Sequence, residues 1–210
     1  MKIKLYSKMQ QTKFKQTEIG MIPEDWEFDS LEKYANFITG KLDSNASEID
    51  GNFPFFTCAP EPLKINTPAF DCEALLLAGN NANGIFHLNY YAGKFNAYQR
   101  TYVITPKDKN KLNLKYLKYQ LNLRLNYLKE ISQGTATKFL TKRILNGLKV
   151  ALPSIDEQSS IAKILSSLDS KIELNQQMNK TLEAIGQAIF KHWFIDFEFP
   201  NEKGKPYKSS

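Results

Sequence analysis

The stretch that decides the architecture is the C-terminal quarter of the chain, residues 152–199, which read LPSIDEQSSIAKILSSLDSKIELNQQMNKTLEAIGQAIFKHWFIDFEF. A set of positions in it recurs at alternating intervals of three and four residues, the spacing of a heptad seam. These positions are Ile161, Ile164, Leu168, Lys171, Asn175, Met178, Leu182, Ile185, Ile189 and His192. One small domain does not easily cover the apolar stripe of such a helix, so we expect a partner helix along it.

Local capping signals mark the start of this helix. Ser154 and Glu157 stand three residues apart, as in a capping box, and Pro153 stops the segment that precedes them. We therefore predict one helix over residues 155–194, roughly 60 Å long at ~1.5 Å per residue.

Two polar residues, Lys171 and Asn175, interrupt the apolar seam near its middle. Polar residues at seam positions weaken a coiled coil but select its register and orientation. This placement favours an antiparallel coiled coil that crosses at its centre, formed with a second copy of the chain or with a second half of a longer one. The plainer alternative is that the helix docks on its own domain.

Upstream of the helix, strand-like patterning gives way to helical patterning. Short runs of β-forming residues, separated by turn residues, fall at residues 53–57, 74–78, 85–88 and 101–105. The intervals between them are too short for crossover helices, so we predict a strongly bent sheet rather than βαβ units. Leucines three or four residues apart predict a helix over residues 113–131, followed by a short helix after Thr141 and a closing strand over residues 148–152.

The predicted fold class is therefore α+β: a domain with a bent β-sheet and packed helices, followed by a long C-terminal helix that forms an antiparallel coiled coil. Trp26 is the predicted core anchor of the domain. The predicted organisation is a flexible leader over residues 1–16, the domain over 17–153, the coiled-coil helix over 154–199 and a mobile tail over 200–210.

Charge is distributed unevenly along the 210 residues, whose net charge is +6. Residues 1–150 carry 21 Lys and Arg against 14 Asp and Glu, whereas residues 151–210 carry 7 against 8. The excess is concentrated in residues 100–149, which hold 12 basic and 2 acidic side chains. A basic globular part attached to a near-neutral helix favours a polyanion partner, above all nucleic acid, over a merely basic protein without one.

The N-terminal residues lack the apolar core of a secretory signal, and no apolar run approaches the ~20 residues that cross a bilayer. The two cysteines, Cys58 and Cys72, form at most one bridge, and we interpret both as buried thiols in a reducing cytoplasm. We therefore expect a cytoplasmic protein without membrane contact.

Residues suited to catalysis are scarce. The sequence contains neither G-x-x-x-x-G-K-[ST] nor G-x-G-x-x-G, and no Asn/Asp-Pro-Pro-aromatic motif of the adenine methyltransferases. His87 and His192 lack zinc-type spacing with the two cysteines. The acid-x-Lys step of a nuclease site occurs at Asp169 and Lys171, on the heptad helix, where we do not expect a metal site. We predict no catalytic residues and no metal ligands.

Three loops carry side chains suited to DNA, at residues 79–84, 94–100 and 132–138. Asn and Gln match two edge atoms of adenine, Arg and Lys match guanine, and hydroxyls and cations contact phosphate. With a weaker fourth site at residue 41, the candidate DNA-binding residues are Lys41, Asn80, Asn81, Asn83, Lys94, Gln99, Arg100, Gln133, Thr135, Thr137 and Lys138. Each one alone is better explained by an ordinary turn. As a set they favour a DNA-binding face, with Arg100 and Lys138 the strongest candidates.

Several segments, taken in order, resemble the specificity subunit of type I restriction–modification enzymes. Residues 155–158 and 190–197, at the two ends of the helix, resemble the conserved helix of that family. Residues 17–26 resemble the segment that opens a target-recognition domain, and residues 133–140 with 148–153 resemble the segment that closes one. The chain departs from the family in size, because such subunits usually carry two recognition domains and two helices in tandem.

The resemblance implies that residues 17–153 are a target-recognition domain, which reads one half-site of double-stranded DNA, and that the chain itself catalyses nothing. It implies two kinds of partner: modification subunits, which act on adenine with S-adenosylmethionine, and ATP-driven restriction subunits. S-adenosylmethionine, ATP and Mg²⁺ are then expected on the partner subunits and no cofactor on this chain. We expect a homodimer through the coiled coil.

Three questions stay open at this point. The chain is either a natural half-length subunit or a fragment of a tandem one. It is alternatively the specificity module of a related, fused or stand-alone restriction system. A different class, a non-catalytic basic coiled-coil adaptor that binds protein or RNA, also fits the composition.

Overall fold

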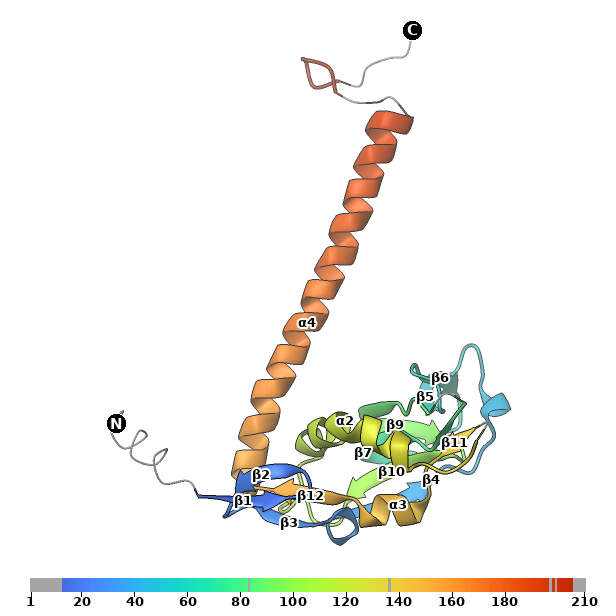
Figure 1. Ribbon diagram of the computed structural model, residues 1–210. Coiled ribbons are helices and arrows are strands. Elements are labelled where there is room, and N and C mark those ends of the chain that lie inside the picture. The colour runs from blue at the N-terminus through green and yellow to red at the C-terminus, as the bar shows by residue number, and fades with distance from the viewer. Residues whose placement is uncertain (1–12, 83, 136, 197, 199, 206–210) are drawn as a thin grey trace. The chain divides into compact units, whose positions relative to one another are not determined.

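The computed structural model of the chain describes residues 13–82, 84–135, 137–196, 198 and 200–205. The chain divides into two compact units, residues 1–163 and 164–210. The first unit contains strands β1 to β12, helices α2 and α3 and the first turns of α4 (Ile155–Phe190), and the second contains the rest of α4 (Figure 1). The predicted α+β class is confirmed.

The centre of the first unit is a six-stranded sheet with the strand order β4-β10-β7-β9-β5-β6. Its strands, in chain order, are β4 (Ala35–Thr39), β5 (Phe53–Phe56), β6 (Leu63–Ile65), β7 (Phe70–Ala78), β9 (Leu88–Ala97) and β10 (Thr101–Pro106). Neighbouring strands run antiparallel, except that β5 runs parallel to β9. The predicted strands at residues 53–57, 74–78 and 101–105 are confirmed as β5, β7 and β10.

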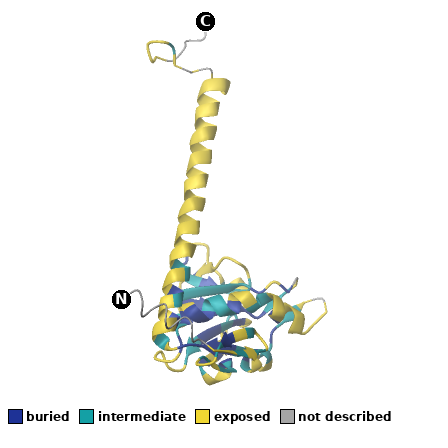
Figure 2. Ribbon diagram, turned by 60° about the vertical axis from the view of Figure 1, so that its left-hand side comes forward, coloured by how far each residue is buried: buried dark blue, intermediate teal, exposed yellow. Residues whose placement is uncertain are grey.

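Both faces of β7 are buried, and this explains the bend of the sheet. Because side chains alternate along a strand, Leu75 and Leu77 join a cluster with α2, whereas Leu76 points into a second cluster. That second cluster consists of strand residues alone: Phe56, Ala74, Leu76, Phe95, Ala97 and Val103. The sheet must bend over these side chains to bury them, and the buried colour follows its strands in Figure 2.

Helix α2 (Leu114–Ile131) covers the other face of the sheet, against β7 and β9 (Figure 1). Four leucines of the predicted stripe are buried, Leu114, Leu117, Leu121 and Leu128, and the fifth, Leu125, packs partly buried against the same core. The side chain of Asn113 caps this helix by accepting a backbone N–H of its first turn at 3.1 Å. The predicted short helix is α3 (Lys142–Gly147), which Thr141 caps in the same way.

Three two-stranded ladders complete the first unit. They are β1 (Phe14–Thr17) with β2 (Gly20–Pro23), β3 (Glu27–Ser30) with β12 (Lys149–Leu152), and β8 (Asn80–Asn81) with β11 (Lys138–Phe139). All three are antiparallel. The predicted closing strand is therefore confirmed as β12, and it pairs with a strand near the start of the domain. Two short 3₁₀ turns, η1 (Leu31–Lys33) and η2 (Ser44–Ala46), flank β4.

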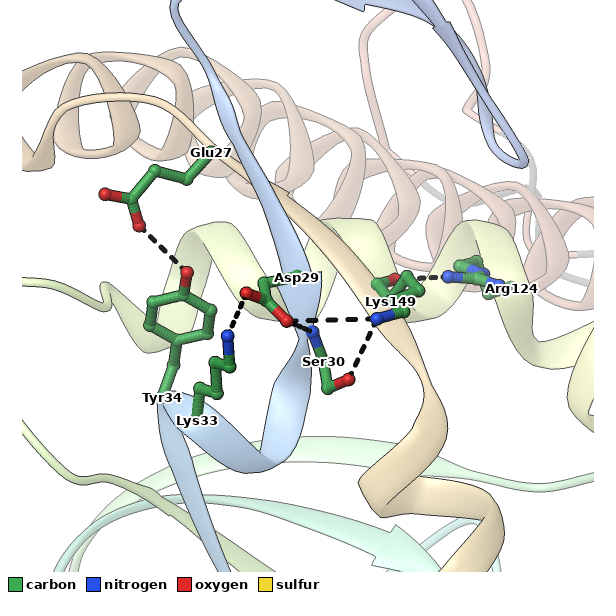
Figure 3. Close-up of polar contacts among 7 residues, drawn as sticks. All are labelled: Glu27, Asp29, Ser30, Lys33, Tyr34, Arg124 and Lys149. Atoms are coloured by element: carbon green, nitrogen blue, oxygen red, sulfur yellow. Dashed lines mark hydrogen bonds and ion pairs between the residues drawn. The ribbon is translucent and has the colours of Figure 1, made fainter.

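Figure 3 shows that charged side chains fasten the β3–β12 ladder to its neighbours. Asp29 contacts Lys33, accepts the backbone N–H of Ser30 at 2.7 Å and lies 3.8 Å from the ammonium of Lys149. The hydrogen bond from Lys33, followed by that from Ser30, lowers the pKa of Asp29 below its usual value. Arg124 of α2 donates to the backbone carbonyl of Lys149. The contacts of this cluster join β3, η1, β12 and α2 to one another. We therefore interpret the cluster as structural.

Tyr34 lies at the edge of the same cluster, where its hydroxyl donates to the carboxylate of Glu27 at 2.8 Å (Figure 3). Burial, and secondly this hydrogen bond, raise the pKa of Tyr34 to about 12. The phenol therefore stays protonated at neutral pH and serves as a donor.

A buried amide anchors the start of α4 to the domain. The side chain of Gln158 is 1% exposed, and its Oε1 accepts the backbone N–H of Asn113 at 2.9 Å. Its Nε2 donates to the carbonyls of Lys111 and Pro153, both at 2.9 Å. One side chain thus joins the end of β12, the segment before α2 and the first turn of α4.

The predicted cap at the start of α4 is present, because Ser154 Oγ accepts the N–H of Glu157 at 3.3 Å.

Because of this anchor, the first turns of α4 belong to the domain, and the boundary of the domain lies within the helix. The compact first unit extends to Lys163 rather than ending at residue 153. Ile161, which we predicted for the seam, packs partly buried against the core of its own domain. The predicted extent of the helix is confirmed, because one π-helical turn, η3 (Lys191–Ile195), follows α4 without a break and carries the helical segment to Ile195. Trp26, predicted as a core anchor, is half-buried instead.

The other corrections concern segment ends. Strand β1 begins at Phe14, so residues 14–16 are strand rather than leader, and residues 1–12 lie outside the described part. Residues 85–87 are not a strand, because Phe86 turns into the core before β9 begins at Leu88. Of the predicted tail, residues 201–205 form a turn in which the N–H of Asn201 donates to the carbonyl of Lys205 at 2.7 Å. Residues 206–210 lie outside the described part.

Beyond the domain, α4 exposes an apolar stripe. The exposed fractions of the apolar seam residues are 62% for Ile164, 53% for Leu168, 53% for Met178, 62% for Leu182, 50% for Ile185 and 44% for Ile189. Ile172, 56% exposed, lies only about 40° from Leu168 around the helix and widens the stripe. An exposed apolar stripe of this length marks a contact surface.

Replacing Gln158 with Ala tests the anchor. We expect the free energy of unfolding to fall by about 3 kcal/mol, because the substitution leaves a buried N–H and two carbonyls without their partner. Gln177→Ala is the matched control, since Gln177 is exposed on the same helix, and its effect is expected to stay within about 0.5 kcal/mol. Urea unfolding of both variants measures the difference, and equal stabilities would contradict the anchoring role.

Candidate nucleic-acid interface

The first and third predicted loops meet in the β8–β11 ladder. Lys138 lies opposite Asn81, and Phe139 lies opposite Asn80. The third loop is closed by its own backbone, because Gln133 and Phe139 exchange two hydrogen bonds of 3.0 and 2.8 Å. Residues separated by more than fifty positions in the sequence are thereby placed side by side.

The turn after β9 joins the same region. The N–H of Gly79 donates to the carbonyl of Arg100 at 2.8 Å, and the N–H of Gln99 donates to the carbonyl of Leu42 at 2.9 Å. The side chain of Gln99 also donates to the carboxylate of Asp43 at 3.1 Å. Arg100, Gln99 and Lys41, which precedes Leu42, therefore belong to one surface region with the first loop.

A polar hollow of about 320 Å³ lies where these segments meet. Its lining is Ser44, Thr57, Cys58, Ala59, Asn80, Asn81, Ala82, Tyr98 and Thr137. The thiol of Cys58 donates to the side-chain oxygen of Asn80 at 2.8 Å, which holds that amide in the wall. Hydroxyl and amide groups of this kind suit hydrogen bonding to base edges.

Cations flank this hollow. A side chain on Gly84 would stand 3.0 Å from Cγ of Lys129 and 3.1 Å from Cγ of Lys138, so the stems of both lysines lie against this glycine. Gly84 has φ +66°, which favours glycine over other residues. Lys41 and Arg100 are exposed in the adjoining segments. The arrangement places positive charge beside the polar hollow, as phosphate contacts require.

Some predicted residues are not brought into this region. Residues 94–97 are part of β9 rather than a loop, and Phe95, Asn96 and Ala97 are buried because they pack inside the bent sheet. Lys94 is exposed on that strand opposite Asp71. Thr135 is exposed on the third loop, and Asn83 lies outside the described residues.

Other residues of the site were missed by sequence reasoning. Ser44, Thr57, Cys58 and Tyr98 line the hollow, yet no local motif distinguishes them. They come together because β5 pairs with the end of β9 and Leu42 bridges to Tyr98. One feature of the sequence could have identified Lys129 as a surface cation, namely its place on the polar side of the predicted helix over residues 113–131.

The cysteines are both free, but they are half-buried rather than fully buried. Burial, the largest cause, raises the pKa of the Cys72 thiol. Among the described residues, no three His, Cys, Asp or Glu side chains gather in a way that could hold a metal ion. No helix within the described ranges is both long and apolar enough to cross a bilayer.

A glycine permits the close approach on which this region depends. A side chain on Gly40 would stand 1.6 Å from the carbonyl oxygen of Ala97, a backbone atom that cannot move away alone. We expect Gly40→Ala to lower the free energy of unfolding by at least about 3 kcal/mol. Gly147→Ala, with no atom within 4 Å of the new side chain, is expected to change it by less than about 1 kcal/mol. Thermal or urea unfolding distinguishes the two, and a neutral Gly40→Ala would contradict the described approach.

Comparison with known proteins agrees with this architecture. The family described as "Type I restriction modification DNA specificity domain" matches residues 23–184. The EcoDI specificity subunit of an Escherichia coli type I restriction enzyme is 38% identical over 192 residues, which are 90% of this chain and 41% of that protein. The MjaIX specificity subunit of Methanocaldococcus jannaschii is 28% identical over 217 residues, which cover 92% of this chain and 49% of that one.

Solved structures share the fold. The S subunit of a type I restriction–modification system from M. genitalium superposes with a TM-score of 0.60 at 18% identity, over 80% of this chain and 48% of that one. The HsdS subunit from Thermoanaerobacter tengcongensis gives a TM-score of 0.57 at 18% identity, over 92% and 50%. The chain thus spans about half the length of the relatives it matches. With most of its length matched and a relative at 38% identity, the chain belongs to the type I restriction–modification DNA specificity domain family.

Proposed function

We propose that this chain is the non-catalytic, sequence-reading component of a type I restriction–modification system and that its domain reads one half-site of double-stranded DNA. The observation that carries the proposal is the β8–β11 ladder, which joins two loops with complementary chemistry. One loop supplies amides suited to base edges, and the other supplies a hydroxyl and a lysine. The relatives at 38% and 28% identity are named as specificity subunits.

Within this site the roles divide by chemistry. The cations Lys41, Arg100, Lys129 and Lys138 contact phosphates and set the position of the duplex. The polar groups of Asn80, Asn81, Gln99, Gln133 and Thr137 contact base edges or the sugar–phosphate backbone beside them. The excess of basic residues between positions 100 and 149 adds a long-range attraction for DNA.

The long helix pairs antiparallel with the helix of a second copy. The exposed stripe from Ile164 to Ile189 supplies the apolar contact, and Lys171 and Asn175 select the orientation. Two-fold symmetry then places two identical readers on an inverted repeat, with a spacer that neither reader contacts. The helix fixes the length of that spacer.

The partners follow from the proposed role. Modification subunits methylate adenine with S-adenosylmethionine, and restriction subunits use ATP and Mg²⁺, so this chain needs no cofactor of its own. The proposed place of action is the cytoplasm.

Selection of binding sites from random duplexes tests the reading function, with the full chain and its methyltransferase partner. We expect an inverted repeat with a constant spacer, because the dimer is symmetric. A single asymmetric motif would count against the symmetric pair. Preference for RNA, or no duplex binding, would support the adaptor alternative. Genomic neighbours separate the fused or stand-alone restriction systems from the proposed one.

Single lysine substitutions test the proposed face. Lys138→Ala and Lys129→Ala are each expected to weaken binding for all sequences and to reduce the slope of log affinity against log salt by about 0.9. Lys94→Ala is the control, because Lys94 is exposed on β9 opposite Asp71 and contacts neither Gly84 nor the β8–β11 ladder. Fluorescence anisotropy at several salt concentrations gives the slopes. Equal slopes for all three variants would reject the assignment of this face.

A further inference from the structure

The middle of α4 has a sequence whose seam residues are symmetric in character about Glu173. The seam residues, and the two residues next to Glu173, have counterparts of the same kind at equal distances on its two sides. Outward from Glu173 the pairs are Ile172 with Leu174, Lys171 with Asn175, Leu168 with Met178, and Ile164 with Leu182. A segment that matches itself when its direction is reversed suits an antiparallel pair of identical helices, in which each residue lies level with its counterpart.

These side chains are uncovered. The exposed fractions are 56% for Ile172 and 57% for Leu174, and they range from 53% to 62% for the four apolar seam residues of the pairs. Lys171 and Asn175 are exposed as well, and this part of α4 has the exposed colour in Figure 2. An isoleucine and a leucine beside two polar seam residues gain nothing from exposure to water, so they mark a contact surface.

Helical geometry places these residues around the seam in a regular way. At 3.6 residues per turn, Lys171 and Asn175 lie about 20° to either side of the middle of the seam, and Ile172 and Leu174 lie about 80° to either side. Glu173 lies on the opposite side of the helix. In an antiparallel pair the two-fold axis maps each flank of the seam onto the same flank of the other copy. The two Ile172 side chains therefore meet on one flank, and the two Leu174 side chains meet on the other.

The polar layer favours the register centred on Glu173 over its neighbours. Seam again faces seam when one helix slides by a heptad, which is about 10.5 Å at 1.5 Å per residue. Sliding in one direction places Lys171 level with Leu168, and sliding in the other places it level with Leu182. Both shifts set the ammonium of Lys171 against a leucine. The register centred on Glu173 sets it beside Asn175 instead, whose amide oxygen can accept a hydrogen bond from it.

The flanking residues favour the same register. Sliding by a heptad in one direction replaces the Leu174 self-contact by a contact of Leu174 with Ser167. Sliding in the other direction replaces the Ile172 self-contact by a contact of Ile172 with Asn179. A parallel pair would set Lys171 directly against Lys171. Of these arrangements, the antiparallel one centred on Glu173 is the one that covers both flanking residues with apolar side chains.

We infer that the face of α4 between Ile164 and Leu182 binds a second copy of this chain antiparallel and in one register, centred on Glu173. The inference rests on the proposed antiparallel pair and adds the residues that determine its register. Lys171 with Asn175 form the polar layer, and Ile172 and Leu174 flank it with self-contacts. The apolar seam alone repeats every heptad, so these four side chains set the overlap of the two helices.

Disulfide formation between copies tests the register. Leu168→Cys is introduced into the whole chain with Cys58 and Cys72 replaced by Ser, and it is mixed with copies of the same background that carry Lys171→Cys, Met178→Cys or Ile185→Cys. We expect a disulfide with position 178, because positions 168 and 178 are level in the inferred register. Positions 171 and 185 are level with 168 after a shift of one heptad in either direction. Mass spectrometry of the digested, crosslinked chains identifies the joined positions.

The outcomes separate this inference from the proposed pairing on which it rests. A disulfide with position 171 or 185 in preference to 178 would overturn the register and leave the antiparallel pair standing. A disulfide that joins position 168 of two copies would indicate a parallel pair. That result, or the absence of any disulfide, would reject the antiparallel pair and the register together. Glu173→Cys, on the opposite side of the helix, is the control and is expected to form no disulfide with itself.

Dimer affinity tests the flanking residues. Ile172→Ala and Leu174→Ala are each expected to raise the dimer dissociation constant by about tenfold, because each substitution truncates both partners of a self-contact. Glu173→Ala is the matched control, since Glu173 lies between them on the opposite side, and its effect is expected to stay within about twofold. Sedimentation equilibrium measures the three constants. Equal constants for the three variants would contradict the self-contacts.

Removal of the polar layer tests its role in the register. Lys171→Leu with Asn175→Leu is expected to give a tighter dimer, because a polar residue on the seam specifies the register at a cost in stability. The mixture of Leu168→Cys and Ile185→Cys copies is then expected to form a disulfide that it does not form with the polar layer present. Absence of this disulfide in the double-leucine background would contradict the assigned role of Lys171 and Asn175.

Discussion

Strand β7 is buried on both faces, and this burial shapes the whole sheet. Leu75 and Leu77 are covered by α2, but Leu76 is covered by side chains from the sheet itself. The sheet must therefore bend, and its bending brings the turn after β9 back beside the end of β7, where the N–H of Gly79 donates to the carbonyl of Arg100. The proposed DNA-binding region exists because of this return, since its segments come from distant parts of the sequence.

A second constraint links the domain to its helix. The amide of Gln158 binds three backbone groups from two segments, the one before α2 and the one after β12, so the first turns of α4 belong to the domain rather than to a flexible linker. The Gln158 anchor also means that the two parts of the continuous helix have different roles. Its first turns complete a core, and the exposed stripe beyond Lys163 is available to a partner.

Prediction from sequence succeeded where a local pattern is sufficient. Leucine spacing located α2, and Ser154 with Glu157 located the start of α4. The short helix expected after Thr141 is α3. Prediction failed where a distant contact overrides the pattern. Residues 85–87 have strand-like composition, yet Phe86 is taken into the core instead. Residues 94–97 looked like a polar loop, yet Asn96 is 4% exposed and donates to the carbonyl of Thr67 within the bent sheet.

Periodicity, capping and charge are properties of neighbouring residues, so the fold class, the long helix with its apolar stripe and the types of residue that suit DNA could be predicted from the sequence. Which of those residues share a surface follows from tertiary contacts instead. The β8–β11 ladder selects Asn80, Asn81 and Lys138, and the packing of strands adds Thr57 and Tyr98 while leaving Lys94 on a strand. The physical reason is that strand pairing between distant segments depends on burial over the whole sheet, which no local window of sequence contains.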